Sequence, residues 1–525
     1  METYDLVIIG GGINGAGIAR DAAGRGLSVL LCEKDDLASH TSSASTKLIH
    51  GGLRYLEYYE FGLVRKALQE REVLLKAAPH IIWPLRFVMP HARDQRPEWM
   101  IRAGLFLYDH LAKREVLPGS ETISLAKHPS GAPLKDAFKR GFVYSDGWVQ
   151  DARLVVLNAM DAAEHGAKIH VRTACVAARR DGEHWLATLE REDGSCFEVR
   201  ARALVNAAGP WVQSLIEDKL AMPSSKSIRL VKGSHIVVKK IFDHPFAYIF
   251  QNPDNRIIFA IPYEKDFTLI GTTDVEYHGD PAQVAIDGDE INYLCEMSNR
   301  YFHSQITPAD VLSTYSGVRP LLDDASDNAS SVTRDYALEM DLKGAPLLSV
   351  FGGKITTFRK LAEEAVDKIA PLLGCGKATW TAGAPLPGGD MPGTDFGRFL
   401  QGLRLRHPWL PEALAERWAR AYGTRVGKLI GRADSLAGLG REVLPGLYEA
   451  ELAYLADAEW ATRSEDILWR RSKLKLHLPA DAAEVVDAWL AARAAAQRGA
   501  ERLIGSFPSK YSPVRRAVSF PAPVR

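Results

Sequence analysis

The turn GGGINGAG, which begins at Gly10, constrains the fold of this chain more than any other segment. Gly10, Gly12 and Gly15 have the spacing GxGxxG, after an apolar run at residues 4–9 and at the start of an alanine-rich helical stretch. A second apolar run at 27–32 completes a strand–helix–strand unit, which implies a parallel sheet. Glycines in this turn allow the backbone to approach a pyrophosphate closely, at a helix N-terminus that favours negative charge.

Glu33 ends the second apolar run, at the distance expected of an acid that accepts a hydrogen bond from a ribose 2′-OH. The acid favours an unphosphorylated ribose over NADP, but it does not separate NAD from FAD. The position of the motif at the start of the chain, and the absence of a second one, favour a single FAD. The turns NAAGPW at 206–211 and FGGK at 351–354 support this interpretation, although each alone is better explained as structural.

A chain of 525 residues is expected to form two or three domains. Lys+Arg and Asp+Glu both total 65, which argues against nucleic-acid binding. The five cysteines are scattered, so the sequence predicts no disulfide framework and no metal site, and all five are expected to be buried. The start of the chain has no basic n-region of a signal peptide, and no stretch reaches the roughly 20 apolar residues of a transmembrane helix.

The pattern along the chain predicts an α/β plus α protein: a Rossmann-like FAD-binding domain, an antiparallel-sheet substrate domain and a C-terminal helical domain. Short apolar runs between residues 236 and 271 alternate with turns, as in an antiparallel sheet, whereas residues 55–115 have a mainly helical pattern broken by prolines. The predicted boundaries are 1–75, 150–225 and 345–384 for the FAD-binding domain, 76–149 and 226–344 for the substrate domain, 385–393 for a linker, and 394–525 for the helical domain with a loose basic tail.

Seven segments together resemble one family. They are DLVIIGGGINGAGIARDAAGRGLSV, TSSASTKLIHGGLRYLEYYEF, NAAGPWV, IRLVKGSHIVV, IIGTTDVEYHGDP, TYSGVRPL and LLSVFGGKITTFRKLAEEA. The chain is similar to the FAD-dependent glycerol-3-phosphate dehydrogenases of the bacterial respiratory type, within the superfamily of D-amino-acid oxidase and glycine oxidase. The resemblance extends over nearly the whole chain and fades near 116–140, near 180–200, around the 385–405 linker and beyond about 505.

This resemblance implies oxidation of sn-glycerol 3-phosphate to dihydroxyacetone phosphate, with hydride transfer from C2 to a non-covalently bound FAD. It also implies electron transfer to a ubiquinone-type quinone, a homodimer, and a peripheral position on the cytoplasmic side of the inner membrane. The family's substrate-contacting positions match Arg54, Tyr55, His235, Thr272, Arg319 and Lys354.

The segment SSASTKLIHGGLRYLE, residues 42–57, is expected to serve the cofactor with its first half and the substrate phosphate with its second. Lys47 and His50 are assigned to the flavin edge, although either residue is also suited to bracing the loop. The residues expected at FAD are Gly10, Gly11, Gly12, Asn14, Gly15, Glu33, Ser42, Ser43, Ser45, Lys47, His50, Gly51, Ala208, Gly209, Gly353, Lys354 and Thr356.

Oxidation at C2 requires a general base for the substrate hydroxyl. His235 is the preferred candidate because an imidazole titrates near neutral pH. Lys354 is the alternative, provided that burial and a neighbouring arginine lower its pKa. Arg319 is assigned to electrostatic stabilisation, since a guanidinium stays protonated.

Residues 96–114 combine Trp99, Phe106 and other apolar residues with flanking arginines and lysines, as in a helix at a membrane interface. The alternative is an ordinary buried helix with charged ends. Three other functions are compatible with parts of the sequence: a glycerol-3-phosphate oxidase that uses O₂, a related flavin amine oxidase, and a dinucleotide-binding sensor without turnover.

Overall fold

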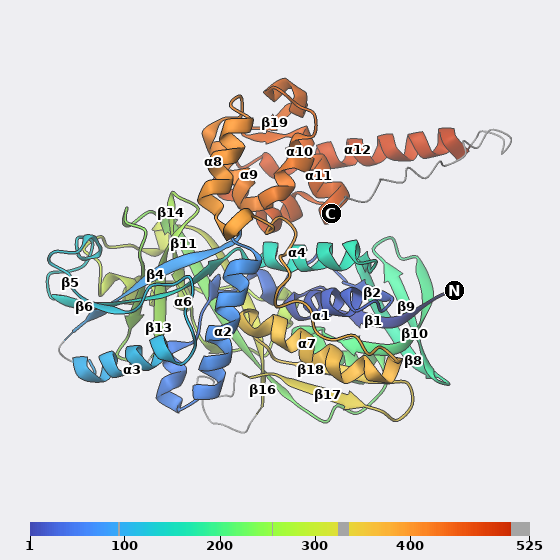
Figure 1. The fold of residues 1–525 in the computed structure, drawn as a ribbon, viewed down its shortest axis with the longest axis horizontal. Helices are drawn as coiled ribbons and strands as arrows, with labels where there is room; N and C mark the ends of the chain where they lie inside the picture. Colours follow the sequence, from blue (N-terminus) through green and yellow to red (C-terminus); the bar gives the residue numbers. More distant parts are fainter. Residues whose placement is uncertain (93–94, 255, 324–334, 506–525) are drawn as a thin grey trace, which may run out of the picture.

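The computed structural model of the protein describes residues 1–92, 95–254, 256–323 and 335–505. Figure 1 shows an α/β layer around β1 and α1 on the right, a large sheet around β4 and β11 on the left, and a group of helices, α8 to α12, above both. The predicted combination of a dinucleotide-binding α/β fold, a second sheet and a C-terminal helical domain is confirmed.

The first sheet is built around the predicted strand–helix–strand unit. β1 (Glu2–Ile9) pairs in parallel with both β2 and β10, so the glycine turn after β1 lies at the carboxyl edge of the sheet. The strand order is β17 (Ala337–Asp341), β18 (Leu347–Phe351), β10 (Cys196–Asn206), β1, β2 (Val29–Cys32) and β7 (Lys168–His170), and β8 (Thr173–Asp181) and β9 (His184–Arg191) extend it from β10.

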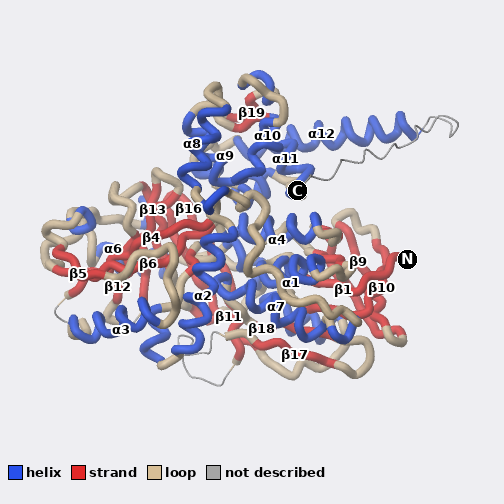
Figure 2. The backbone as a smooth tube through the Cα atoms, in the orientation of Figure 1, coloured by secondary structure: helices blue, strands red, loops and turns tan. Residues whose placement is uncertain are grey.

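Three helices cover one face of this sheet. α1 (Ile13–Gly24) is almost entirely buried and packs between α4 (Asp151–Glu164) and α7 (Phe358–Ile369), as Figure 2 shows. Alanines and glycines make up much of α1, and their small size allows α4 and α7 to approach it closely.

The second sheet is mainly antiparallel, as predicted, with one parallel pair between β12 and β4. Its central order is β15 (Val275–Glu276), β11 (Ile228–Lys239), β14 (Phe267–Gly271), β13 (Ile257–Tyr263), β12 (Ala247–Gln251), β4 (Ile82–His91), β6 (Arg140–Val149) and β3 (Leu48–Ile49), with β16 (Val311–Leu322) on β11 and β5 (Glu121–Ser124) on β6. The helices beside this sheet are α2 (Phe61–Ala77), α3 (Glu98–His110) and α6 (Gly288–Asn299), and the short α5 (Val212–Ser214) follows β10.

The prediction of a mainly helical region at 55–115 is wrong for β4. Its prolines, Pro84 and Pro90, signal a break, yet both lie within a strand that pairs with β6 along its length. β12 pairs with β4 only at Phe87 and Val88, so neither proline is required to donate to a second neighbour.

The C-terminal domain is helical, with α8 (Phe396–Arg406), α9 (Glu412–Tyr422), α10 (Val426–Ile430), α11 (Glu449–Glu459) and α12 (Ala482–Gly505). It also contains a hairpin that the sequence did not predict, formed by β19 (Glu442–Leu444) and β20 (Leu447–Tyr448). The segment 385–393 has little regular structure, but it is no exposed tether, because Leu386 and Met391 are buried and the Leu386 N–H donates to the Ala77 carbonyl. The predicted basic tail from Phe507 lies outside the described residues.

Two cysteines correct the expectation that all five are buried: Cys196 is exposed at the start of β10 and Cys375 is half-buried. Within the ranges given above, no helix has both the length and the apolar content needed to cross a bilayer.

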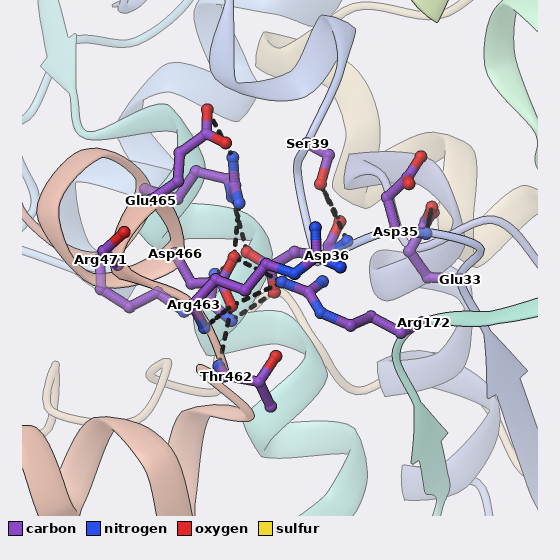
Figure 3. Close-up of polar contacts among 12 residues, drawn as sticks. Glu33, Asp35, Asp36, Ser39, Arg172, Thr462, Arg463, Glu465, Asp466 and Arg471 are labelled. Atoms are coloured by element: carbon purple, nitrogen blue, oxygen red, sulfur yellow. Dashed lines mark hydrogen bonds and ion pairs between the residues drawn. The ribbon is translucent and has the colours of Figure 1, made fainter. Parts of the chain in front are cut away.

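A buried ion cluster joins the C-terminal domain to the loop after β2 (Figure 3). Asp36, only 1% exposed, accepts from Arg470 Nε at 2.6 Å and from Arg471 Nη2 at 2.8 Å. Both arginines belong to a π-helical turn, η13 (Asp466–Arg471), in which Asp466 in turn accepts from Arg172 Nη2 at 2.9 Å. The cluster therefore ties the loop that begins at Glu33 to η13 of the C-terminal domain.

We expect Asp36→Asn to destabilise the docking of the C-terminal domain by about 3–5 kcal/mol, because it leaves two buried guanidinium groups without their shared carboxylate. The free energy of the first unfolding transition in denaturant measures the change, and hydrogen exchange in η13 locates it. Asp434→Asn, at an exposed position of the same domain, is the matched control. A change below about 0.5 kcal/mol in the Asp36 variant, which is typical of a surface substitution, would contradict this assignment.

Candidate active site

The glycine turn has the geometry that its spacing predicts. Gly10 has φ +112°, and a Cβ there would lie 2.5 Å from the Ala207 carbonyl oxygen. A Cβ at Gly15 would lie 1.9 Å from the Gly10 carbonyl oxygen. A larger residue at either position would therefore disrupt the tight turn and its packing on the end of β10, and this tight turn is what lets the backbone approach a bound pyrophosphate.

Glu33 lies beside this turn, at the end of β2. One carboxylate oxygen accepts from the Gly11 N–H at 2.6 Å and the other accepts from the Asp35 N–H at 2.9 Å. Burial raises the pKa of Glu33, against the opposing effect of these two N–H groups. The carboxylate is thereby oriented at the wall of a cavity, with lone pairs left for a ribose hydroxyl.

This first cavity, of about 380 Å³, runs from the loop after β2 to the turn before α7. Trp211 forms part of its wall, and its ring lies 3.7 Å from Lys34 Nζ and 4.6 Å from the His40 ring. The expected cofactor residues that line it are Gly10, Gly12, Asn14, Glu33, Ser42, Ala208, Gly209 and Gly353.

Two observations show that this cavity fits an adenine dinucleotide. The backbone cradle at Gly10 is one that a side chain would fill. The second is Asn14, whose Nδ2 donates to the Gly352 carbonyl at 3.1 Å, while its buried Oδ1 has no partner among the described residues. A ligand group at this end of the cavity would satisfy that oxygen.

Not every residue of the segment 42–57 faces a cavity. Ser42 does, and its Oγ accepts from the Ile13 N–H at 3.0 Å. Lys47 does not: it is fully buried, and its Nζ lies 2.8 Å from an Asp151 carboxylate oxygen. The structure thus corrects the flavin-edge assignment of Lys47 in favour of bracing the loop.

Ser43 and Gly51 also lie outside both cavities that the expected site residues form. The Ser43 hydroxyl donates to the His40 carbonyl within the loop, and the Gly51 N–H donates to the Tyr108 hydroxyl at 2.8 Å. Gly52 lines the second cavity instead. A sequence motif alone does not separate these alternatives, because neighbouring residues of an irregular loop point in opposite directions.

The second cavity brings together residues that are far apart in the sequence. Its volume is about 310 Å³, and it meets the first cavity at Ile13, Thr41, Ser42, Pro320, Gly352 and Gly353, which line both. All six residues expected at the substrate line this cavity: Arg54, Tyr55, His235, Thr272, Arg319 and Lys354. Ser45, His50 and Thr356 line it as well, and the His50 N–H donates to Thr356 Oγ1 at 3.3 Å.

Arg319 is fixed in place by several acceptors. Its Nη1 is ion-paired with Asp274, and its Nη2 donates to Thr272 Oγ1 at 3.2 Å and to the Thr273 carbonyl at 3.1 Å. A Cβ on Gly233 would lie 2.1 Å from the same nitrogen, so this glycine leaves the space that the guanidinium occupies. The roles of Asp274 and Gly233 were not predicted, although both residues lie in segments that carry the family resemblance.

His235 is held between two strands, because it pairs with Gly271 of β14 and with Tyr315 of β16. Its ring stacks on Tyr315 at 4.7 Å, and its Nε2 lies 3.0 Å from Thr46 Oγ1. Burial, reinforced by the charges of Lys47 and Arg319, holds the pKa of His235 well below the ordinary value. The imidazole is therefore neutral at neutral pH.

Lys354 and Arg54 both line the second cavity, as Tyr55 does. Lys354 Nζ lies 4.0 Å from the centroid of the Tyr55 ring. Arg54 is half-buried in the 3₁₀ segment Leu53–Tyr58 (η2), with Nη2 3.4 Å from the Tyr58 hydroxyl. Together with Arg319, these residues give the cavity a cationic lining suited to an oxyanion.

Comparison with known proteins assigns this architecture. The family model "FAD dependent oxidoreductase" matches residues 5–359, and the model "C-terminal domain of alpha-glycerophosphate oxidase" matches residues 379–497.

Several curated relatives are more than half identical to the chain, among them the following two. A glycerol-3-phosphate dehydrogenase of Pseudomonas aeruginosa is 57% identical over 91% of this chain and 93% of its own length. A D-erythritol 1-phosphate dehydrogenase of Brucella abortus is 54% identical over 91% of this chain and 95% of its own length.

A solved structure resembles the whole chain. The glycerol-3-phosphate dehydrogenase from Bacillus halodurans complexed with FAD has a TM-score of 0.74 and 29% identity, covering 96% of this chain and 94% of that one. The resemblance seen in the sequence motifs and the expectation of FAD are thereby confirmed. The chain belongs to the FAD-dependent oxidoreductases, and within them to the glycerol-3-phosphate dehydrogenase family, with FAD as its cofactor.

Proposed function

We propose that the protein oxidises sn-glycerol 3-phosphate to dihydroxyacetone phosphate. The observation that carries the proposal is the cation-lined cavity that opens into the cofactor cavity at Gly352 and Gly353. A phosphorylated alcohol in the outer cavity can present its C2 to a ring seated at this junction. The names of the relatives at more than half identity support the same substrate class.

The cations divide into two roles. Lys354 and Arg54 bind the substrate phosphate, and the ring of Tyr55 under Lys354 Nζ favours the charged ammonium. Arg319 is held rigidly by Asp274 and Thr272, so it stabilises the charge that develops on the C2 oxygen without reorganising. FAD, when bound, accepts the hydride from C2.

His235 accepts the proton of the C2 hydroxyl. Its lowered pKa keeps the imidazole neutral, which is the form that accepts a proton. The cation–π contact of Lys354 favours the ammonium, which has no lone pair to accept a proton. This contact supports His235 over Lys354 as the base.

A longer polyol phosphate is the second candidate substrate. The Brucella abortus relative is named for D-erythritol 1-phosphate and is nearly as similar as the Pseudomonas aeruginosa enzyme. Both substrates place a hydroxyl-bearing carbon next to a phosphorylated one, so the cavity lining described above serves either.

We propose a membrane quinone as electron acceptor, with α3 as the contact to the bilayer surface. α3 packs inward through Leu105 and Tyr108, which are almost fully buried, while Trp99 is 69% and Phe106 58% exposed. Exposed aromatics of this size, beside Arg102 on the same helix, suit the interface of an anionic bilayer. The homodimer and the inner-membrane location stay predictions.

Anaerobic addition of sn-glycerol 3-phosphate to the purified holoenzyme tests the reaction directly. We expect bleaching of the oxidised flavin band, at a rate higher than with D-erythritol 1-phosphate at equal concentration. Faster bleaching with D-erythritol 1-phosphate would favour the second candidate, and bleaching with neither would contradict the proposal. When the reduced enzyme is then exposed to air, reoxidation by a soluble quinone without formation of hydrogen peroxide separates the dehydrogenase from an oxidase.

For His235→Ala, we expect the rate of flavin reduction to fall about 10²–10⁴-fold, the range for loss of a general base. Binding of dihydroxyacetone phosphate should change far less. In the wild type, protonation of His235 should cause no loss of kcat/KM down to about pH 6.5, and the loss should come only at a clearly more acidic pH, because burial holds the pKa of His235 well below its ordinary value.

The variant separates this titration from that of the substrate phosphate, which lies near pH 6 and persists when His235 is absent. His303→Ala, at a half-exposed position outside the cavities, is the control. Unchanged flavin reduction in His235→Ala, or a rate that rises only at alkaline pH, would move the role of base to Lys354.

For the double variant Trp99→Ser, Phe106→Ser, we expect weaker flotation with anionic liposomes and an unchanged rate of flavin reduction. Leu312→Ser combined with Leu405→Ser removes two exposed apolar side chains elsewhere and serves as the matched control. Equal flotation of both double variants and the wild type would exclude α3 as the contact.

A further inference from the structure

A second basic cavity adjoins the substrate cavity. Its volume is about 670 Å³, and Arg54 and Ile257 line both cavities. It is formed by η2, by the chain between β4 and α3, by the end of β12 and by the C-terminal end of α6. Its other lining residues include Glu57, Arg96, Lys135, Asn252, Arg256 and Arg300. We call it the outer basic cavity.

The lining of this cavity carries five cations and one carboxylate, Glu57. Glu57 is engaged by Arg96 at 2.6 Å, and Lys135 Nζ donates only to a neutral acceptor, the Asn299 carbonyl, at 2.6 Å. Arg300 is exposed at the C-terminal end of α6 and forms no ion pair within the described part of the chain. Arg256 is paired with Asp254 at 3.2 Å. Arg54, Lys135 and Arg300 thus bring positive charge to one space without a carboxylate partner in the described part of the chain.

Asn252 supplies an independent indication of a ligand. It is only 5% exposed, it lines the cavity, and its Oδ1 makes no hydrogen bond to a described residue. The amino group interacts weakly with the Tyr293 hydroxyl, and that hydroxyl donates to Asp254 at 2.9 Å. A buried amide oxygen without a partner is costly, and a ligand that donates to it removes the cost.

We propose that the outer basic cavity is a second binding site, for a phosphate ester that carries free hydroxyl groups. The arginines and Lys135 suit its oxyanion, because guanidinium and ammonium groups donate charge-assisted hydrogen bonds to phosphate. Asn252 completes the match: its amino group donates to a phosphate oxygen, and its carbonyl oxygen accepts from a hydroxyl.

Two sources offer this chemistry. One is a free phosphate ester such as glycerol 3-phosphate, held one cavity outside the site of reaction. The other is the glycerol-phosphate headgroup of an anionic lipid, since Arg96 directly precedes α3. Neither source requires the reaction proposed above, so the flavin-bleaching experiment fails or succeeds independently of this site.

The test uses the holoenzyme and radiolabelled orthophosphate in equilibrium dialysis at constant ionic strength. We expect the wild type to bind a second phosphate besides the one in the substrate cavity. In the double variant Lys135→Gln, Arg300→Gln, the affinity of the second site should fall about tenfold or more, the effect of losing charge-assisted hydrogen bonds. Turnover at saturating substrate should stay within about twofold, since neither residue lines the substrate cavity.

Two further variants sharpen the comparison. Asn252→Asp is nearly isosteric and adds a carboxylate, so it should repel the second phosphate without removing a cation. The control Lys343→Gln, Arg432→Gln removes the same charge from exposed positions outside the cavity and should bind as the wild type does.

Vesicles separate the two sources. Phosphatidylcholine vesicles are compared with and without phosphatidylglycerol. If the lipid headgroup is the ligand, the wild type binds no second orthophosphate, and the cavity variants lose the extra binding that phosphatidylglycerol provides. Orthophosphate binding and vesicle binding that are the same in the wild type, in both cavity variants and in the control would overturn the proposal.

Discussion

The ion cluster around Asp36 is the contact on which the cofactor cavity and the substrate cavity depend. Residues of one short turn, η13, support a wall of both cavities. Arg470 and Arg471 of η13 hold Asp36, three residues after the ribose-facing Glu33. Trp469, in the same turn, lies 6.2 Å from the Tyr315 ring, and Tyr315 stacks on His235. Buried charges contribute little net stability but strongly penalise any arrangement that separates them. The C-terminal domain therefore has one favourable docked position, and that position supports the cofactor loop and the proposed base together.

A second buried pair sets the electrostatics of the substrate cavity. Lys47 and Asp151 are both fully buried, and Lys47 Nζ lies 4.8 Å from the centroid of the Tyr315 ring, on which His235 stacks. The positive charge of Lys47, with that of Arg319, opposes protonation of His235. A base in these surroundings stays in its neutral form, which can accept a proton, but it binds that proton weakly. A proton taken from the substrate is therefore transferred to another group. The Thr46 hydroxyl, 3.0 Å from His235 Nε2, is the first group positioned to relay it.

Local patterns in the sequence predicted the features that depend on neighbouring residues. They failed for features whose conformation depends on residues far away in the chain. The glycine turn and Glu33 were predictable, because spacing, backbone conformation and a following strand are encoded within about 25 residues. The orientation of Lys47 was not, because its partner Asp151 lies 104 residues away at the start of α4. β4 was missed for a related reason: its prolines are compatible with a strand only because β12 covers so short a part of it. The six residues expected at the substrate were assigned through family motifs. Gly233 and Asp274 lie in the same motifs, but their contacts with Arg319 were not predicted, because these contacts depend on how β11, β14 and β16 come together.

The position of Arg54 would link the proposed substrate binding to the proposed membrane contact. Arg54 lies on η2, which packs against α3, and η2 also carries Glu57, the partner of Arg96 two residues before α3. Tyr59, 80% exposed, follows η2 directly. A side chain shared by two cavities cannot bind a phosphate in each at full strength, because its five donors point in one fixed fork. A phosphate in the outer basic cavity would thus compete for Arg54 with the substrate phosphate in the substrate cavity. It would be released toward the substrate cavity when the Arg54 guanidinium turns to that cavity. Any displacement of α3 at a bilayer would move η2, and with it the one cation that both cavities use.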